Sequence, residues 1–302
     1  MPNTCLQLAL SADQNYVDGL VATLSGVASH LPRTTRAEVS VIDCGIHAET
    51  RQRVSELVES RFPNLSLVFL PIGDGVLARL PFPDGLEYAN RSVYARLFLP
   101  DLLPGRPRVI YLDCDLLVDV DISELAALAL DGAVVAAAVN EEQELKSDAG
   151  TLVFNFGVMV MDLQLMRESE LTRCAVEMAG KQNTRHGDQT LLNALLRGKW
   201  KQLDRRWNRQ VFLLPSFSIF RTEPDTIWHV YMGRKPWHFH RAGARGLVAE
   251  YYQLLNRVGW TPTFQPQLSM NSSPGRDLLK GSLAAGSRSW RKLRGPAPTL
   301  RA

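Results

Sequence analysis

Apolar runs of strand length alternate with helical apolar patterns through the first half of this 302-residue chain. Runs at 6–10, 39–42 and 65–70 predict strands, and apolar residues at helical spacing over 17–24 and 54–58 predict helices between them. Strands that alternate with helices in this way usually pair in parallel. The sequence therefore predicts an α/β fold whose mostly parallel central sheet is flanked by helices.

The pattern continues downstream with less regular spacing. We expect a helix over 92–99, strands over 109–112, 133–139 and 153–161, and helices over 171–181 and 189–197. From Leu213 on, aromatic residues and turn formers predict irregular structure packed on the sheet. We expect a globular domain over 1–265 and a separate basic tail over 266–302.

Two aspartates, Asp113 and Asp115, directly follow the predicted strand that ends at Leu112. In open α/β sheets, ligands gather beyond the carboxyl ends of the strands. Carboxylates at positions i and i+2 can turn toward one divalent cation, and Mg²⁺ or Mn²⁺ prefers oxygen ligands and bridges to substrate phosphates. Taken alone, however, the pair is equally typical of a solvated acidic turn.

The same two carboxylates are also compatible with a phosphohydrolase of the haloacid-dehalogenase kind. There the first Asp after an apolar strand is a nucleophile and the second is a general acid. That site usually lies near the N-terminus and precedes a Gly-Thr type of turn. Here Leu116 and Leu117 follow the second Asp, and 112 residues precede Asp113, so this alternative is disfavoured.

Six segments match one family in the same order along the chain. They are Ser11-Ala12-Asp13-Gln14-Asn15-Tyr16, Tyr94-Ala95-Arg96-Leu97, Asp113-Cys114-Asp115, Phe154-Asn155-Phe156-Gly157-Val158, Gly187-Asp188-Gln189-Thr190-Leu191-Leu192-Asn193, and His229 through Lys235 to His238. Over about residues 5–240 the chain resembles glycosyltransferase family 8. This retaining group includes bacterial lipooligosaccharide galactosyltransferases and glycogenin.

The resemblance implies a GT-A fold, with a Rossmann-like nucleotide-binding half and a cation held by Asp113, Asp115 and His229. By itself, His229 is more typical of a structural histidine in an aromatic segment, and only the aspartate pair and Lys235 favour the cation ligand. Lys235 is the expected partner of the donor phosphates, because a cation and a lysine together neutralise a departing diphosphate. Gly233 follows Met232, which stands where the family usually has glycine.

The resemblance also assigns the nucleotide and sugar contacts. The nucleotide contacts it implies are Ser11, Ala12, Asp13, Asn15, Tyr16, Cys114, Gly233 and Lys235, with Tyr16 stacked on uracil, and His238 is expected near the leaving diphosphate. The donor-sugar contacts it implies are Arg96, Asn155, Asp188 and Gln189. Simpler explanations are a helix N-cap at Asp13, Asn15 or Asp188 and a surface position for Arg96.

Asp188 and Gln189 are the expected catalytic residues, since in the family the glutamine faces the anomeric carbon opposite the leaving group. An amide is a poor nucleophile, so we favour a front-face reaction in which these two residues position and stabilise the sugar. The bulky Phe156 stands where relatives often have Ala or Ser. We expect it to reshape the donor-sugar pocket, so the motif does not identify the sugar.

Charge and cysteine usage bear on the environment of the protein. A net charge of +3 is too near balance to indicate a nucleic-acid partner. The four cysteines lack regular spacing, and we expect reduced, mostly buried thiols in a cytoplasmic protein. The tail from Arg276 on combines apolar and basic residues, typical either of an interfacial helix at an anionic membrane or of a disordered segment.

These observations together predict a retaining, metal-dependent hexosyltransferase that moves galactose or glucose from a UDP-sugar to a glycan, glycolipid or glycoprotein acceptor. Mn²⁺ or Mg²⁺ is the expected cofactor. The alternatives are a nucleotidyltransferase or phosphohydrolase that uses the same carboxylates, and a non-catalytic module that binds sugar nucleotides or glycans.

Overall fold

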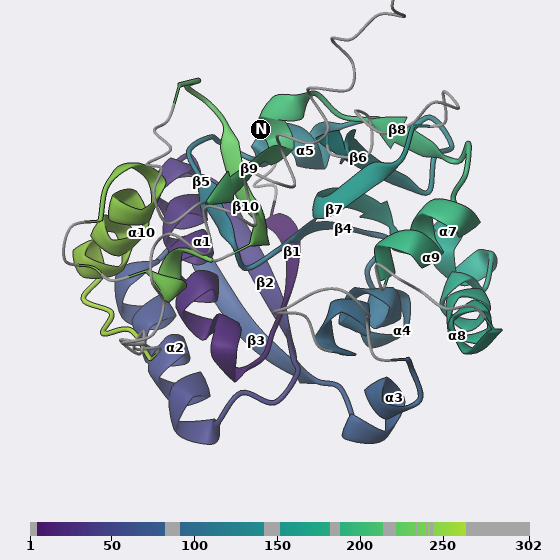
Figure 1. Ribbon diagram of the computed structural model, residues 1–302, viewed down its shortest axis with the longest axis horizontal. Helices are drawn as coiled ribbons and strands as arrows, with labels where there is room; N and C mark the ends of the chain where they lie inside the picture. Colours follow the sequence, from purple (N-terminus) through teal and green to yellow (C-terminus); the bar gives the residue numbers. More distant parts are fainter. Residues whose placement is uncertain are drawn as a thin grey trace, which may run out of the picture.

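The computed structural model describes residues 5–81, 91–141, 152–181, 188–213, 222–233, 235–239, 241 and 244–263, and the tail over 266–302 lies outside them. In this part of the chain, a central sheet has seven strands in the order β3-β2-β1-β4-β7-β6-β8 (Figure 1). The strands are β1 (Cys5–Ala12), β2 (Arg36–Asp43), β3 (Leu65–Pro71), β4 (Arg108–Leu112), β6 (Val135–Val139), β7 (Phe154–Asp162) and β8 (Trp200–Gln202).

The predicted mostly parallel sheet is confirmed. Strands β3, β2, β1 and β4 pair in parallel, as do β6 and β8, whereas β7 is antiparallel to both of its neighbours, β4 and β6. The predicted helices of the first half are α1 (Val17–His30) and α2 (Ala48–Arg61). They connect β1 to β2 and β2 to β3, as βαβ units require.

The sheet separates two hydrophobic cores, and alternate residues of one strand belong to different cores. Leu8 and Leu10 of β1 pack with α1 and α2, whereas Ala9 packs on the opposite side. That second core is covered by η2 (Arg91–Phe98), α7 (Leu163–Glu168), α8 (Leu171–Lys181) and α9 (Asp188–Leu195). Because both faces are covered, strands such as β6 are apolar throughout.

A second sheet lies beside the first and was not predicted. It has the order β5-β10-β9, from β5 (Leu116–Val118), β9 (Arg209–Leu213) and β10 (Ile227–Gly233). Strand β10 is antiparallel to β5 and parallel to β9. The expectation of irregular structure after Leu213 was therefore wrong for β10, where buried Trp228 and Val230 flank His229.

Helix α10 (Gly246–Arg257) also contradicts that expectation. Its buried side chains Leu247, Tyr251, Leu254 and Leu255 follow helical spacing, and the helix packs against α1. The predicted helix over 92–99 is instead the 3-10 helix η2 followed by the short helix α4 (Leu99–Leu102). The remaining short elements are η1 (Gln14–Tyr16), α3 (Asp74–Ala78), α5 (Ser123–Ala127), η3 (Arg205–Asn208) and η4 (Pro236–His238).

The four cysteines are free, as expected, but only Cys114 is buried, while Cys5 is exposed and the other two are half-buried. The expectation of mostly buried thiols was therefore wrong. Within the described residues, no helix is long and apolar enough to cross a membrane.

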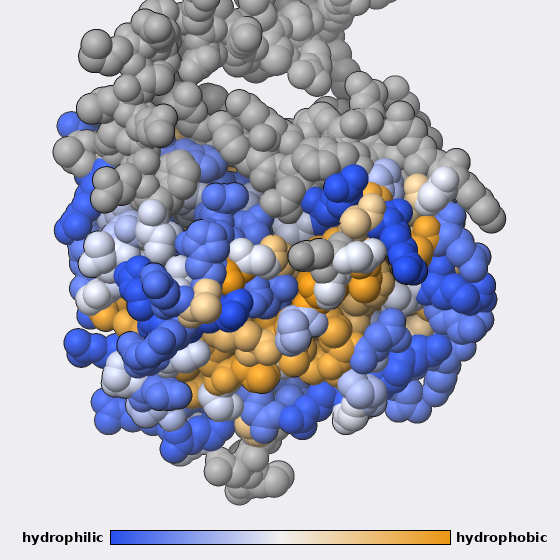
Figure 2. Space-filling model, turned by 90° about the horizontal axis from the view of Figure 1, so that it is seen from below, coloured by the Kyte–Doolittle hydropathy of each residue, from blue (hydrophilic) through white to orange (hydrophobic). Residues whose placement is uncertain are grey.

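Apolar side chains reach the surface on one face of the molecule. Figure 2 shows a band of them, bordered by hydrophilic side chains, on the face seen from below. The large apolar side chains that are exposed in the described part of the chain are Val68, Val76 and Leu152. Val68 belongs to β3, which is an edge strand of the central sheet. Among the described strands, none pairs with the outer side of β3.

Candidate active site

The carboxyl ends of β1 and β4 meet at one edge of the central sheet, because these strands are parallel neighbours. The Ser11 hydroxyl lies 2.8 Å from the Tyr111 hydroxyl, which in turn donates to Oδ1 of Asp113 at 3.1 Å. The Cys114 thiol also donates to the Ser11 carbonyl at 3.2 Å, so the end of β1, which carries Ser11 and Ala12, lies beside the Asp113-Cys114-Asp115 turn.

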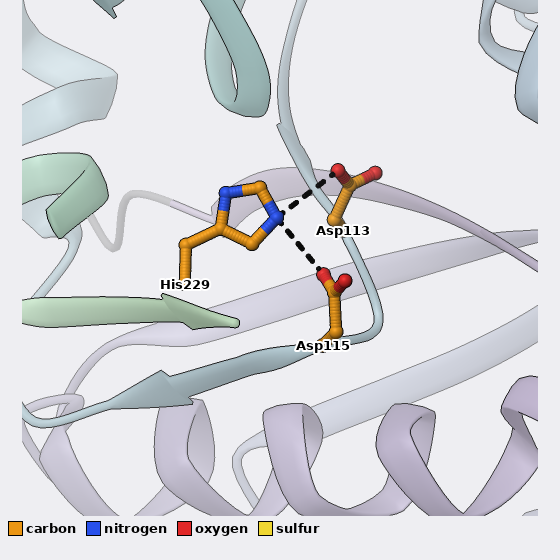
Figure 3. Close-up of side chains that lie close together, drawn as sticks. All are labelled: Asp113, Asp115 and His229. Atoms are coloured by element: carbon orange, nitrogen blue, oxygen red, sulfur yellow. Dashed lines mark ion pairs between the residues drawn. The ribbon is translucent and has the colours of Figure 1, made fainter. Parts of the chain in front are cut away.

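The turn brings two carboxylates to one imidazole (Figure 3). The Nε2 atom of His229 lies 3.1 Å from Oδ1 of Asp115 and 3.7 Å from Oδ2 of Asp113. One ligand atom from each of these residues lies within 4.8 Å of the other two. The three predicted cation ligands are thus adjacent in space, although His229 lies more than 110 positions after the two aspartates in the chain.

The second sheet delivers His229 to this position. His229 lies opposite Leu116 in the β5–β10 pairing, and the backbone N–H of Val230 donates to the Asp115 carbonyl at 3.1 Å. The imidazole is 2% exposed and lies against Gly157 of β7. A Cβ atom on Gly157 would come within 2.3 Å of the ring, so the absence of a side chain there makes room for His229.

The cluster fits a divalent cation. Its donors are two carboxylates and one imidazole, a set that suits Mn²⁺ or Mg²⁺ with further oxygen ligands. Oδ1 of Asp115 is buried and has no hydrogen-bond partner among the described residues. A buried carboxylate oxygen in that state is costly unless a cation lies near it.

Lys235 provides one such cation in the structure. Its ammonium group lies 2.6 Å from Oδ2 of Asp115 and donates to the Val230 carbonyl at 2.7 Å. Burial alone would raise the pKa of Asp115, but the charges and hydrogen bonds of Lys235 and His229 together outweigh burial and hold this pKa below its ordinary value. Lys235 is the predicted phosphate partner. In the structure it is 6% exposed and pairs with a carboxylate of the cluster.

Arg96 is not a surface residue. Its guanidinium lies 3.0 Å from Oδ1 of Asp113, donates to the Phe156 carbonyl at 3.1 Å, and lies 4.6 Å from the centre of the Tyr111 ring. The side chain is nearly buried. Arg96 thus supports a predicted cation ligand directly, which places it at the edge of the cluster.

The segment after β1 has the predicted N-cap geometry. The Asp13 carboxylate accepts from the backbone N–H of Asn15 at 2.8 Å and begins helix η1. Asn15 is exposed and Tyr16 is half-buried. The Tyr16 ring meets Trp237 edge to face, with ring centres 5.2 Å apart. Trp237 lies two residues after Lys235 in the chain. The predicted base-binding tyrosine therefore contacts the segment that carries the predicted phosphate lysine.

Asn155 is buried at 1% exposure, and its amide is engaged inside the protein. Oδ1 of Asn155 accepts from the backbone N–H of Gly157 at 2.9 Å and from Nδ2 of Asn208 at 2.8 Å. Oδ1 of Asn208 in turn lies 2.8 Å from Nδ1 of His229. A predicted sugar contact and a predicted cation ligand are therefore joined by Asn208.

The other predicted residues are only partly described. Helix α9 begins at Asp188, but the side chains of Asp188 and Gln189 lie outside the described part of the structure. Gly233 ends β10, and Nδ1 of His238 accepts from the Lys235 backbone N–H at 3.1 Å. Cys114 is fully buried, and burial raises the pKa of its thiol well above the ordinary value.

Two residues that shape this cluster, Gly157 and Asn208, were not predicted from the sequence. Gly157 lies in the family motif over 154–158, but only the fold shows that an imidazole occupies the space beside it. Asn208 ends a 3-10 turn, and such an asparagine is usually interpreted as a turn former. Its neighbours in the sequence, Arg205, Arg206, Arg209 and Gln210, are polar apart from Trp207, so nothing in the sequence indicates that Asn208 is buried.

Comparison with known proteins gives one consistent result. A family model described as Glycosyl transferase family 8 matches residues 7–241. General stress protein A of Bacillus subtilis (strain 168) is 26% identical over 289 residues, which cover 87% of this chain and 98% of that protein. Lipopolysaccharide 1,2-glucosyltransferase of Escherichia coli (strain K12) is 28% identical over 255 residues, covering 78% and 73% respectively.

Solved structures agree on the fold. The crystal structure of the galactosyltransferase LgtC in complex with donor and acceptor sugar analogues superposes with a TM-score of 0.70 at 22% identity. The match covers 85% of this chain and 98% of that one. At this identity the likeness shows the fold alone, and it agrees with the GT-A architecture that the sequence motifs imply.

Proposed function

The chain belongs to glycosyltransferase family 8, and from this membership we propose that it is a retaining, metal-dependent hexosyltransferase that takes galactose or glucose from a UDP-sugar. The acceptor is a glycan, glycolipid or glycoprotein. The observation that carries the proposal is the Asp113, Asp115 and His229 cluster, whose ligand atoms lie within 4.8 Å of one another at the edge of the central sheet.

Each predicted site residue has a role in this proposal. Asp113, Asp115 and His229 hold the cation; Ser11, Ala12, Asp13, Asn15, Tyr16, Cys114, Gly233 and Lys235 bind the nucleotide; Arg96, Asn155, Asp188 and Gln189 bind the donor sugar; and His238 lies near the diphosphate. The burial of Asp115 and Lys235 supports the first two assignments, since buried charges persist where they have partners.

The proposed reaction separates the leaving group from the sugar. A bound Mn²⁺ or Mg²⁺ supplies positive charge that stabilises the departing diphosphate. The bond between the anomeric carbon and the diphosphate oxygen breaks, and its electron pair stays with UDP. The acceptor hydroxyl then bonds to the anomeric carbon on the same face and gives its proton to that oxygen. Asp188 and Gln189 position the sugar and stabilise its developing positive charge.

Lys235 adds a second source of charge compensation in this scheme. In the structure its ammonium is paired with Asp115. With a cation held by Asp113, Asp115 and His229, Lys235 would no longer be needed to compensate the charge of Asp115 and could turn its ammonium toward a diphosphate oxygen.

The test is cation-dependent binding and turnover. UDP should raise the melting temperature only when Mn²⁺ or Mg²⁺ is present, and a panel of UDP-sugars should identify one that is hydrolysed or transferred. Asp115→Asn should abolish both effects. Asp119→Asn is the matched control, because Asp119 directly follows β5, the strand that Asp115 directly precedes, and forms a partly exposed pair with His30.

Two results would contradict the proposal. Release of phosphate from simple esters without use of UDP-sugars would indicate the phosphohydrolase alternative. Cation-dependent binding of UDP-sugars without any turnover, across a range of glycan acceptors and water, would indicate a binding module that retains the fold.

A further inference from the structure

A continuous chain of buried hydrogen bonds joins β7 to the cation cluster. It runs from the backbone N–H of Gly157 to Oδ1 of Asn155 (2.9 Å), from Nδ2 of Asn208 to the same Oδ1 (2.8 Å), and between Oδ1 of Asn208 and Nδ1 of His229 (2.8 Å). We call these four residues the amide chain. Asn155, Asn208 and His229 are 1%, 0% and 2% exposed.

One atom determines the direction of every bond in the amide chain. The backbone N–H of Gly157 can only donate, so the atom of Asn155 that faces it must be the carbonyl oxygen. That oxygen can only accept, and therefore the atom of Asn208 next to it must be the amino group. The remaining oxygen of Asn208 then requires a proton on Nδ1 of His229.

The consequence at His229 concerns the tautomer. A neutral imidazole with its proton on Nδ1 has its lone pair on Nε2. Nε2 is the atom that faces Asp113 and Asp115. Histidines that bind metals generally donate their other ring N–H to an oxygen acceptor, which fixes the ring and its tautomer. In this chain the acceptor is a side-chain amide rather than a carboxylate.

The consequence at Asn155 concerns the donor sugar. With Oδ1 engaged twice, Asn155 has only Nδ2 left to interact, and Nδ2 is buried without a hydrogen-bond partner in the part of the chain that the structure describes. A buried amide donor without a partner destabilises the protein, so a ligand that supplies an acceptor is favoured there. If the Asn155 amide flipped, Oδ1 would occupy the position of Nδ2, and the Gly157 N–H would lose its acceptor. Asn155 therefore offers a donor, and the group it binds must be an acceptor oxygen.

We propose that Asn208 is a positioning residue for both halves of the site: it holds His229 in the cation-binding tautomer and fixes Asn155 as a donor to an oxygen of the donor sugar. This inference rests on the proposed function. Asn208 is proposed to contact neither the cation nor the sugar. It determines which nitrogen of His229 carries the proton and which atom of Asn155 faces the sugar.

Gly157 influences both the first bond of the amide chain and the position of His229 at its other end. Its N–H sets the direction of the amide chain, and the absence of its side chain admits His229. A Cβ atom there would also lie 3.1 Å from Oδ1 of Asn208. The local geometry of β7 thus determines the imidazole's position and its tautomer together.

A purely structural role for Asn208 makes different predictions. If it only satisfied buried polar groups, its replacement would lower stability without a specific effect on cation affinity or on donor binding. Two variants separate the possibilities. Asn208→Leu is similar in size and removes both bonds, whereas Asn208→Asp keeps an acceptor for His229 and removes the donor to Asn155.

For Asn208→Leu, the Kd of Mn²⁺ in the presence of UDP should rise about 10–100-fold, the usual effect of losing a partner of a metal-binding histidine. Nitrogen-15 NMR of histidine-labelled, cation-free protein at mildly alkaline pH reports the tautomer directly. The wild type should show a protonated Nδ1 at His229, assigned by its loss in His229→Gln, and the leucine variant should not. Wild-type Mn²⁺ affinity with a protonated Nδ1 in Asn208→Leu would overturn the inference.

For Asn208→Asp, Mn²⁺ affinity should be unchanged or higher, because the carboxylate still accepts from Nδ1 and adds negative charge. Asn155 should then turn its amino group toward the carboxylate and lose its donor to the sugar. The KM for the UDP-sugar should rise about tenfold while UDP itself binds as before, which corresponds to one hydrogen bond. A variant that changes both quantities together, or neither, contradicts the proposal even if Asn208→Leu does not fold.

Val58→Ala is the stability control, since it removes buried apolar atoms from helix α2 without touching the cluster. It should lower the melting temperature and leave the Mn²⁺ Kd unchanged. If wild-type protein shows no cation-dependent binding of UDP, the proposed function fails. The NMR measurement on cation-free protein still decides the role of Asn208 in that case.

Discussion

The ammonium group of Lys235 lies 2.6 Å from Oδ2 of Asp115, and both side chains are buried. Removing one partner of a buried ion pair leaves an uncompensated charge and costs about 3–5 kcal/mol. Lys235→Met should therefore lower the free energy of unfolding by about that amount in cation-free buffer. Mn²⁺ should restore part of the loss, because it compensates the same carboxylate, and urea denaturation with and without Mn²⁺ measures both.

The control for this prediction is Lys201→Met. Lys201 pairs with Asp131 at the surface, where an ion pair contributes about 0–1 kcal/mol. Its replacement should have little effect, with or without Mn²⁺. If Lys235→Met were as stable as the wild type in cation-free buffer, Asp115 would not depend on this lysine for its charge.

Gly157→Ala should disrupt the cluster more than the fold. The added methyl group would lie 2.3 Å from the His229 ring, so the imidazole must move away from the carboxylates. The Mn²⁺ Kd should rise by at least about tenfold, and overpacking should cost about 1–3 kcal/mol of stability. Calorimetric titration of Mn²⁺ in the presence of UDP measures the first effect.

Gly105→Ala is the matched control, because no atom lies within 4 Å of a Cβ atom at that position. It should leave Mn²⁺ binding unchanged. Unchanged binding in Gly157→Ala as well would mean that His229 can reach the cation from a different position.

The end of the described domain depends on Asp18. Its buried Oδ1 accepts from Nε1 of Trp260 at 2.8 Å, and from the backbone N–H and hydroxyl of Thr263 at 2.8 and 3.0 Å. Asp18→Ala should cost about 1–3 kcal/mol for each donor that stays buried. Hydrogen exchange over 259–263 should accelerate, whereas exposed Glu59→Ala should change neither quantity. Unaltered exchange in Asp18→Ala would show that α10 alone anchors this segment.

The parts of the fold that the sequence predicted are those with a strong period. Strands β1 to β3 and helices α1 and α2 follow one another with clear apolar spacing, and each is local in the chain. Strand β10 escaped prediction because its burial depends on pairing with β5, whose residues lie more than 100 positions earlier in the chain: Ile227 pairs with Val118 and His229 with Leu116. Strand β7 is antiparallel for a similar reason, since direction in a sheet depends on the connection and not on the strand's own residues.

The site shows the same division. The motifs identified Asp113, Asp115, His229 and Lys235 correctly as neighbours, because their residue types are those that cations and phosphates require. They gave no indication that Lys235 pairs with Asp115 or that Arg96 supports Asp113. Asn208 was missed altogether, since an amide acquires its role only from the partners that the fold supplies.

Cys114 should be the least reactive thiol of the folded protein. Burial raises its pKa well above the ordinary value, and burial raises the pKa of Cys44 to about 12. A higher pKa means less thiolate at a given pH, and the thiolate is the species that reacts with iodoacetamide. At neutral to mildly alkaline pH, mass spectrometry should find Cys114 unlabelled until the protein is unfolded.

Exposed Cys5 provides the internal comparison, since access favours its labelling in the native protein. Rapid modification of Cys114 under native conditions would show that the turn between β4 and β5 opens readily. That result would be difficult to reconcile with a preformed cation cluster on the same turn.

Arg96 and Tyr111 both bind Oδ1 of Asp113, which leaves Oδ2 as the oxygen nearer to His229. This arrangement predicts that Arg96 acts on the cation ligand. Lysine retains the charge but neither the planar fork nor the stacking on Tyr111, so Arg96→Lys should raise the Mn²⁺ Kd by about tenfold. Tyr111→Phe removes one neutral donor and should raise the Kd by about fivefold.

The family resemblance instead implies a contact between Arg96 and the donor sugar, and one measurement separates the two roles. At saturating Mn²⁺, a residue that only orients Asp113 should leave the KM for the UDP-sugar unchanged in Arg96→Lys. If the Mn²⁺ Kd stays at its wild-type value while that KM rises, Arg96 serves the donor and its bond to Asp113 is incidental. If both rise, the guanidinium bridges the cation ligand and the sugar, which its position between Asp113 and the Phe156 carbonyl permits.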